Sequence, residues 1–372
     1  MTKYKMIAPC IFGVEGILAD ELRRIGAEAV NAENGRVLFS GDASILASAN
    51  INSRFAERIM LNLGSFRAST FTELFDGVKA IPLENYISVK DAFPVKGWSL
   101  NSQLYSVPDC QSIIKKACVE RLKSVYKTNW FEETGPIHQI QFSILKDQVT
   151  IMLDTSGHGL HKRGYRATSN AAPIKETLAA AMCDLARIFP DTHIYDPFCG
   201  SGTILIEAAL MAKKQAPGLL QHFAAERFGF IGEDVWREQR AAAMDKILPN
   251  IEFTAQGYDI DPKCVKLTLE NAKKAGVEKY VKAEVRDVRD FTLPEGRTLV
   301  ITNPPYGERL LDIKDAEELY VVMGKVFVRG QGKKYYVISP HDEFEKFFGA
   351  KPDKKRKLYN GMIKCDLNMY FK

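Results

Sequence analysis

The chain has 372 residues and a mass of 41.8 kDa, which is more than one typical domain needs, so we expect two or three compact units. Its 46% hydrophobic and 26% charged residues are typical of an ordinary soluble protein rather than of a membrane-embedded chain. The net charge of +5 permits an anionic partner without requiring one.

Seven cysteines are scattered along the chain without a C-x-x-C pair or a histidine cluster nearby. This argues against a disulfide framework and against a zinc site, predicts no metal, and favours a reducing compartment. The N-terminus lacks the apolar core of a signal peptide. The most apolar helix candidate, Thr203 to Met211, contains Glu207 and is too short to cross a bilayer. We therefore predict a cytoplasmic protein without a membrane segment.

The first ~60 residues have the pattern of a small α/β unit. Apolar residues recur at helical spacing from Glu15 to Ile25, and Gly26 ends that helix. The Asn34-Gly35 pair between short apolar runs predicts a hairpin turn.

A second segment extends from about Arg54 to Gly157. It combines a strand-like run at 58–61, a helix from Gln111 to Tyr126, and two strand-like runs at 139–145 and 149–153. No catalytic constellation is recognisable in either segment, so we interpret both as a recognition or scaffold region.

A Gly-rich, basic stretch at 156–166 precedes a helix predicted from Lys175 to Ile188, and we place a domain boundary there. Beyond it, strand and helix signals alternate, as a parallel α/β sheet requires. The expected strands are 193–195, 253–257, 281–285, 298–301 and 334–339. The Asn360-Gly361 pair then predicts a terminal antiparallel hairpin with a type I′ turn.

The first chemical motif is DPFCGSGT, which starts at Asp196 and lies between an expected strand and an expected helix. Gly200 and Gly202 allow positive φ and a close approach of the backbone to a ligand. A dinucleotide fingerprint needs a third glycine where Leu205 stands, which weakens the case for a pyrophosphate. Asp196 suits the cationic amino-acid end of a ligand better than a phosphate; the alternative is a plain helix-entry turn.

The second motif is GYDIDP, in which Asp261 and Pro262 frame the start of a helix that Gly276 ends. Asp259 remains at the end of the preceding strand, where a carboxylate can accept hydrogen bonds from ribose hydroxyls. The alternative is that Asp259 only forms the turn. Asp287 follows the next strand and could accept a hydrogen bond from an adenine amine, although a solvated loop acid is the commoner case.

The third motif is TNPPYG, in which neither Pro304 nor Pro305 has an N–H to donate. The loop is stiff and presents mostly carbonyl acceptors. Asn303 adds a side-chain acceptor and Tyr306 adds a flat aromatic face. Such a site suits a planar group with an exocyclic –NH2, since acceptors take its hydrogens while its ring stacks on the tyrosine.

Methyl transfer to an aromatic amine fits this arrangement. Acceptors that draw both amine hydrogens can favour a more nucleophilic nitrogen, and a sulfonium methyl donor in line completes the geometry. The proton becomes acidic only as the methyl arrives, so no strong general base is needed. The alternative is a rigid structural turn with a packed tyrosine.

The sequence resembles the class I S-adenosylmethionine-dependent RNA methyltransferases that carry an N-terminal THUMP domain, and in particular the bacterial branch that makes N2-methylguanosine in large-subunit ribosomal RNA. The resemblance spans nearly the whole chain. It rests on FGVEGILADELRRIGA, LHKRGYR, APIKETLAAA, DPFCGSGTILIEAAL, GYDID, the NAKKAG stretch and TNPPYGERL.

The resemblance implies an α/β fold: a Rossmann-like class I methyltransferase sheet with a terminal antiparallel hairpin, preceded by α+β ferredoxin-like and THUMP domains. We expect the domains at 1–54, 55–160 and 161–372. S-adenosylmethionine is the implied cofactor, and the target base would be held by Asn303, Pro304 and Tyr306. The implied cofactor-binding residues are Asp196, Phe198, Gly200, Gly202, Thr203, Asp259, Ile260, Asp287 and Thr177, with Lys175 and Glu176 beside the last of these.

Structured RNA is the implied partner, with ribosomal RNA foremost and transfer RNA also open. Lys162, Arg163, Arg166 and the basic run 354–357 are candidate phosphate contacts, and a solvated basic face is the alternative for each. Some members of this family carry a second, fused methyltransferase domain, whereas this chain ends directly after the expected terminal hairpin, so the resemblance implies a single activity.

Four alternatives remain open: adenine N6 methylation, transfer RNA as the substrate, a nicotinamide-dependent oxidoreductase, and a non-catalytic RNA-binding assembly factor.

Overall fold

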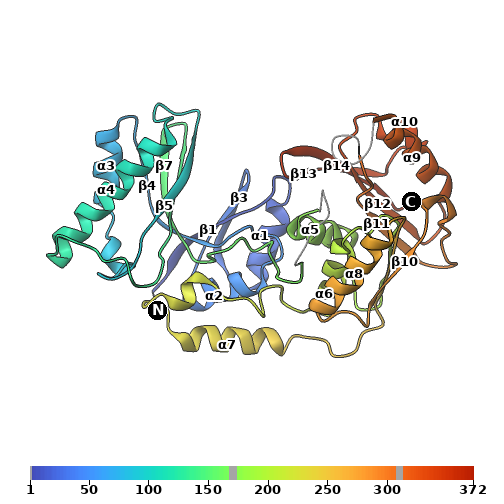
Figure 1. Cartoon of the computed structure of the whole chain (residues 1–372), viewed down its shortest axis with the longest axis horizontal. Helices are drawn as coiled ribbons and strands as arrows, with labels where there is room; N and C mark the ends of the chain where they lie inside the picture. The colour runs from blue at the N-terminus through green and yellow to red at the C-terminus, as the bar shows by residue number, and fades with distance from the viewer. Residues whose placement is uncertain (1, 167–173, 307–312) are drawn as a thin grey trace.

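The computed structural model describes residues 2–166, 174–306 and 313–372. Within these ranges the chain forms two seven-stranded sheets, which lie one after the other along the long axis of the molecule (Figure 1). We call them the N-terminal sheet, β1 to β7, and the C-terminal sheet, β8 to β14. No helix in the described ranges combines the length and apolar character needed to cross a membrane.

The N-terminal sheet has the strand order β2-β3-β1-β4-β7-β6-β5. Its strands are β1 Tyr4–Pro9, β2 Glu28–Glu33, β3 Arg36–Gly41, β4 Met60–Arg67, β5 Val95–Leu100, β6 Ile140–Leu145 and β7 Gln148–Asp154. Its helices are α1 Glu15–Arg24, α2 Ala43–Asn52, α3 Phe71–Lys79 and α4 Val107–Tyr126, with a 3-10 turn at Leu83–Asn85. The predicted hairpin is confirmed, because β2 and β3 pair across Gly35, whose φ is +74°.

Strand β4 joins the two N-terminal units into one sheet. Its Leu61 pairs with Met6 of β1 on one side and with Leu153 of β7 on the other. The sequence predicts two consecutive units but not a shared sheet, because pairing between distant strands leaves no local signal.

The C-terminal sheet has the order β10-β9-β8-β11-β12-β14-β13, parallel up to β12 and antiparallel thereafter. Its strands are β8 His193–Asp196, β9 Thr254–Asp259, β10 Val281–Val285, β11 Thr298–Thr302, β12 Lys333–Ser339, β13 Lys354–Asn360 and β14 Ile363–Tyr370. The terminal hairpin is confirmed, but the predicted type I′ turn is wrong. Of the two loop residues only Gly361 has positive φ (+69°), which fits a type II′ turn.

Helices cover both faces of the C-terminal sheet. On one face lie α5 Glu176–Ala186, α6 Thr203–Ala212 and α8 Pro262–Lys274, whose apolar residues share a core with Ile194 and Ala255. On the other lie α9 Ile313–Val326 and α10 Phe344–Phe348, which share a core with Tyr258 and Val300. The predicted helical excursion at 216–250 contains a 3-10 turn at Ala224–Arg227 and α7 Glu233–Met244, which packs against α2.

Candidate active site at the strand carboxyl ends

The glycine loop connects β8 to α6 and needs both of its predicted glycines. Gly200 and Gly202 have φ of +54° and +78°, a region that favours glycine. A Cβ on Gly202 would lie 2.8 Å from Cγ2 of Thr268, so a side chain there would also clash. The loop therefore exposes backbone where a ligand can approach closely. Thr203 begins α6 and is buried, with its hydroxyl 3.2 Å from that of Ser201.

Helix α8 holds the glycine loop in place. Asp261 caps this helix, as predicted, by accepting a hydrogen bond from the backbone N–H of Lys263. From the same helix, Thr268 donates to the carbonyl of Gly200 and Asn271 donates to that of Ser201, each at 3.0 Å. The role of Thr268 was not predicted from the sequence, although its helical spacing from Asp261 places it two turns inside α8.

Asp259 lies at the end of β9 and contacts the same loop. Its carboxylate accepts hydrogen bonds from the backbone N–H groups of Gly200 and Asp261, both at 2.9 Å, one on each oxygen. Burial raises the pKa of this carboxyl, while the two backbone hydrogen bonds oppose the shift. Each oxygen keeps a further lone pair, so the group can still accept ribose hydroxyls. The adjacent Ile260 side chain is 69% exposed, an apolar surface suited to cover a flat ring.

Asp196 lies beneath the loop and is only 1% exposed. It accepts hydrogen bonds from the Thr302 hydroxyl at 2.6 Å and from the backbone N–H of Phe198 at 3.1 Å. Burial raises its pKa to about 7, against the effect of these hydrogen bonds, and the charge of Asp259 raises it further. The expected ligand-facing carboxylate is thus an internal connection between β8 and β11.

The Asn303-Pro304-Pro305-Tyr306 loop begins where Thr302 ends β11. The Oδ1 atom of Asn303 is buried and has no hydrogen-bond partner within the part of the chain that the structure describes. Tyr306 is 6% exposed, and its hydroxyl accepts a hydrogen bond of 2.8 Å from Asn360 of β13. The last four residues of the TNPPYGERL motif, 307–310, lie outside the described residues.

Two further predicted cofactor residues have hydrogen-bond partners within the protein. Asp287 lies at the end of β10, on the same sheet edge as Asp259. The backbone N–H of Arg289 donates to it at 2.8 Å and its side chain forms an ion pair with it, which lowers the pKa of Asp287. Thr177, at the start of α5, is fully buried and donates its hydroxyl to Glu57 at 2.7 Å. The partner of Thr177 in this structure is therefore the carboxylate of Glu57, in the N-terminal part of the chain.

Glu57 connects the N-terminal units to the start of α5. Besides Thr177, Lys175 Nζ and His161 Nδ1 each lie 3.1 Å from its carboxylate. Burial opposes ionisation of Glu57, but the His161 contact, the charge of Lys175 and the Thr177 hydroxyl outweigh burial and lower its pKa to about 2. Glu57 was not singled out from the sequence, because its partners are distant along the chain.

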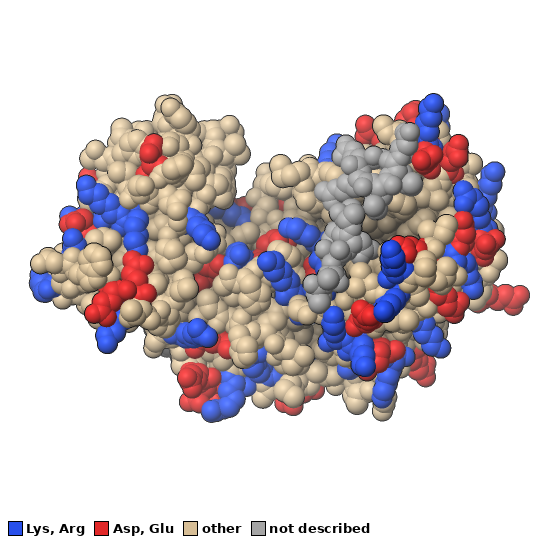
Figure 2. Space-filling model, viewed as in Figure 1, with Lys and Arg blue, Asp and Glu red and all other residues tan. Residues whose placement is uncertain are grey.

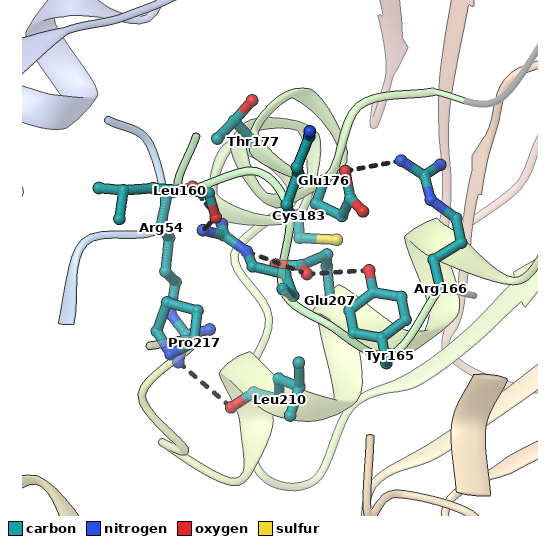
Figure 3. A network of polar contacts seen from close by, with 12 residues as sticks. Arg54, Leu160, Tyr165, Arg166, Glu176, Thr177, Cys183, Glu207, Leu210 and Pro217 are labelled. Atoms are coloured by element: carbon teal, nitrogen blue, oxygen red, sulfur yellow. Dashed lines mark hydrogen bonds and ion pairs between the residues drawn. The ribbon is translucent and has the colours of Figure 1, made fainter. Parts of the chain in front are cut away.

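A second polar cluster, which we call the domain joint, lies between the N-terminal units and α6 (Figure 3). It comprises Arg54, Arg163, Tyr165 and Glu207. The Arg163 guanidinium donates to the carbonyls of Leu160 and Arg54, both at 2.6 Å, and its Nε lies 3.5 Å from Glu207. Tyr165 donates to Glu207 at 3.0 Å, and burial raises the pKa of its phenol.

The predicted RNA contact at Arg163 does not fit the structure, because its side chain is only 2% exposed and faces Glu207. Arg166 is also engaged internally, with Glu176 at 2.8 Å and the carbonyl of Ile174 at 3.1 Å. Lys162 is exposed.

In the basic run 354–357, Arg356 donates to the carbonyl of Gly13, whereas Lys354 and Lys357 are exposed.

Surface charge does not gather into a single patch on the face shown in Figure 2. Lys and Arg side chains are spread among Asp and Glu, and the surface is hollowed between the lobe that contains α3 and α4 and the rest of the molecule. Among the described residues, no group of three or more His, Cys, Asp or Glu side chains is placed to hold a metal ion.

Comparison with known families matches three parts of the chain. The RlmL ferredoxin-like domain matches residues 5–60, the THUMP domain matches 68–154, and the RMKL-like methyltransferase domain matches 163–369.

Relatives match over the whole chain. "Putative RNA methyltransferase YpsC" of Bacillus subtilis is 44% identical over 100% of this chain and 97% of its own length. The ribosomal RNA large subunit methyltransferase K/L of Syntrophotalea carbinolica is 33% identical over 98% of this chain, which spans about half (53%) of that relative. A solved structure of the methyltransferase-like protein SMU.472, complexed with SAH, is 39% identical and superposes with a TM-score of 0.95 over 100% of this chain and 98% of its own.

Proposed function

The chain belongs to the RMKL-like methyltransferase family, and from that premise we propose that it transfers a methyl group from S-adenosylmethionine to the exocyclic N2 of a guanine in structured RNA, with 23S ribosomal RNA as the substrate. We divide it into a ferredoxin-like unit at 1–54, a THUMP domain at 55–160 and a catalytic domain at 161–372. The THUMP domain would hold the RNA and the C-terminal sheet would carry the chemistry.

S-adenosylmethionine is the cofactor, in keeping with the SAH in the 39% identical structure, and it supplies an electrophilic methyl group when bound. The residues present fit it. Gly200 and Gly202 have the positive φ of a tight strand-to-helix binding turn, so the loop can bring its backbone close to a ligand. Asp259 retains acceptor capacity for ribose hydroxyls, and Ile260 offers an exposed apolar surface for a purine ring.

The observation that carries the proposal is the buried Oδ1 of Asn303, which has no hydrogen-bond partner among the residues that the structure describes. A buried acceptor without a donor costs free energy, unless a ligand supplies the donor. An exocyclic amine has two hydrogens, and Pro304 and Pro305 add no competing N–H next to Asn303. Asn303 would therefore hold the amine and orient its lone pair, and pre-organised acceptors of this kind need no strong base.

The position of Asn303 relative to the cofactor loop supports the same chemistry. Thr302, the residue before it, donates to Asp196 at the start of the glycine loop. This hydrogen bond adds to the direct pairing of β11 with β8, so the amine acceptor and the donor-binding loop are held at the ends of adjacent strands. Methyl transfer requires such fixed spacing between the two reacting groups.

The choice of guanine in ribosomal RNA is supported by relatives of this chain that are named as ribosomal RNA large subunit methyltransferases. Transfer RNA guanine and adenine N6 remain the competing targets, since adenine also carries an exocyclic amine. The acceptor loop alone suits both bases.

The test is methylation by the purified full-length protein with S-adenosylmethionine. Protein-free 23S ribosomal RNA and bulk transfer RNA are incubated separately, and their nucleosides are analysed by mass spectrometry. We expect N2-methylguanosine in the ribosomal RNA only. N6-methyladenosine as the sole product would contradict the guanine assignment. Product only in transfer RNA would show that transfer RNA, and not ribosomal RNA, is the substrate. Binding of RNA without consumption of donor would favour an assembly factor.

A further inference from the structure

A groove of about 460 Å³ opens on the C-terminal sheet, on the face that carries α9. Its lining includes the three tyrosines Tyr195, Tyr258 and Tyr280 and the three cations Lys279, Lys282 and Arg286. None of these residues belongs to the candidate active site. The function proposed above leaves this combination of rings and cations unexplained.

The strand alternation places the groove on the opposite side of the sheet from the glycine loop. Ile194 and Ala255 face the core formed with α5, α6 and α8, whereas Tyr195 and Tyr258 point the other way, toward the core formed with α9. The chain between β10 and β11 forms only the 3-10 turn Val288–Asp290, so that the sheet over β8, β9 and β10 keeps an open surface.

The charge of the groove is one-sided. Lys279 and Lys282 are exposed, and within the described residues the lining includes no Asp or Glu. Arg286 lies over the ring of Tyr258, 4.3 Å from its centroid, and its one acidic neighbour is Glu284 at 3.3 Å. Tyr258 is buried beneath Arg286, so the ring surface left for a base is that of the half-buried Tyr195 and Tyr280. The groove thus combines aromatic surface with exposed lysines, the two features that bind a base and its phosphate.

We propose that this groove binds a nucleotide, with its base against the tyrosine faces and its phosphate at Lys279 and Lys282. The nucleotide belongs to a single-stranded segment of the RNA substrate, and binding of a free mononucleotide instead is a separate outcome of the test below. The RNA source rests on the proposed function, since the groove would then hold a segment that passes behind the catalytic edge. It would act as a docking site that contributes affinity without contacting the reacting atoms.

The experiment uses the full-length protein and a fluorescein-labelled decauridylate, with binding followed by anisotropy from 50 to 200 mM salt. The variant Lys279→Gln/Lys282→Gln removes two groove charges. The matched control, Lys273→Gln/Lys274→Gln, removes two exposed charges from the end of α8, outside the groove. A second RNA carrying 4-thiouridine is cross-linked, and the modified peptides are identified by mass spectrometry.

We expect the groove variant to weaken binding about fivefold or more, and to reduce the slope of log K against log salt by about 0.7 for each phosphate that the protein no longer neutralises. The control should change affinity less than twofold. Cross-links should map to peptides that contain Tyr195 or Tyr280, and should disappear in Tyr195→Leu. These readouts need no methyl donor, so they remain interpretable if the catalytic proposal fails.

Uridine 5′-monophosphate distinguishes the two sources. If it binds wild type but not the groove variant, while decauridylate binds both equally, the site takes a free nucleotide. If the groove variant binds decauridylate and uridine 5′-monophosphate as wild type does, the proposal is overturned. Equal weakening by the groove variant and the control overturns it as well, because the effect would then be general electrostatics.

Discussion

The domain joint and the strand-end site both bury polar groups, but they differ in what those groups face. In the joint, Arg163 faces Glu207 and donates to two carbonyls. At the strand ends, Asp196 and Asp259 have no Lys or Arg ion-pair partner in the described ranges, and Asn303 Oδ1 has no donor. An opposite charge that faces a buried charge indicates a structural role, and so does the buried contact of Asp196 with Thr302, whereas Asp259 and Asn303 keep acceptor capacity for a ligand. Three atoms of the joint, Arg54 Nη1, Arg163 Nε and Glu207 Oε2, also lack a hydrogen-bond partner among the described residues.

We expect the largest effect from a substitution that removes the ion pair of the domain joint. Arg163→Met leaves the buried Glu207 without its ion-pair partner and with only the charge of Arg54 nearby, and we expect a loss of about 3–5 kcal/mol of folding free energy, measured by urea unfolding. The control Arg163→Met/Glu207→Gln removes the buried charge but keeps an acceptor for Tyr165, and should recover most of the loss. An unchanged stability together with weaker RNA binding would instead restore Arg163 as a phosphate contact.

We expect the second-largest effect from a substitution in the candidate active site. Asn303→Ala removes the unpartnered acceptor, and we expect kcat to fall roughly 10²–10³-fold. The melting temperature and the affinity for S-adenosylmethionine should stay near wild type. Asn303→Asp keeps acceptor oxygens and should retain more activity than Asn303→Ala. Wild-type turnover in Asn303→Ala would remove Asn303 from the catalytic set.

The pH dependence of folding stability should reveal the buried carboxyl of Asp196. The pKa of Asp196 is raised from 3.8 to about 7, so the folded state binds a proton more tightly than the unfolded state does. The stability from this group is full below about pH 4 and is lost as pH rises through 7.

Asp196→Asn cannot ionise, so its melting temperature should fall less than that of the wild type between pH 5 and pH 8. Glu57, with a pKa lowered to about 2, is ionised throughout this window and does not contribute to the difference. Parallel pH profiles of wild type and Asp196→Asn would show that Asp196 does not titrate there.

We expect the smallest effect from the loss of a hydrogen bond that supports the glycine loop. Thr268→Val keeps the side-chain shape but removes the hydrogen bond to the carbonyl of Gly200. We expect the free energy of S-adenosylmethionine binding to weaken by about 0.5–1.5 kcal/mol, which is roughly a three- to tenfold lower affinity when measured by calorimetry. Thr70→Val, which removes a cap of α3 far from the site, should leave that affinity unchanged.

The sequence by itself determined the local elements and the chemical motifs. Helical spacing and cap residues located α1 and α8, alternation located the terminal hairpin, and the glycine loop, Asp259 and Asn303 were each recognisable from their immediate neighbours. These features depend on residues a few positions apart, which a single sequence displays directly.

Only the tertiary structure decided which distant groups meet. It showed that β4 joins the N-terminal units, that Arg163 faces Glu207 rather than solvent, and that Thr302 links Asn303 to Asp196. The sequence shows the same basic residues in 160–166 whether they point inward or outward. Their direction follows from long-range packing, which decides whether a buried charge finds its partner.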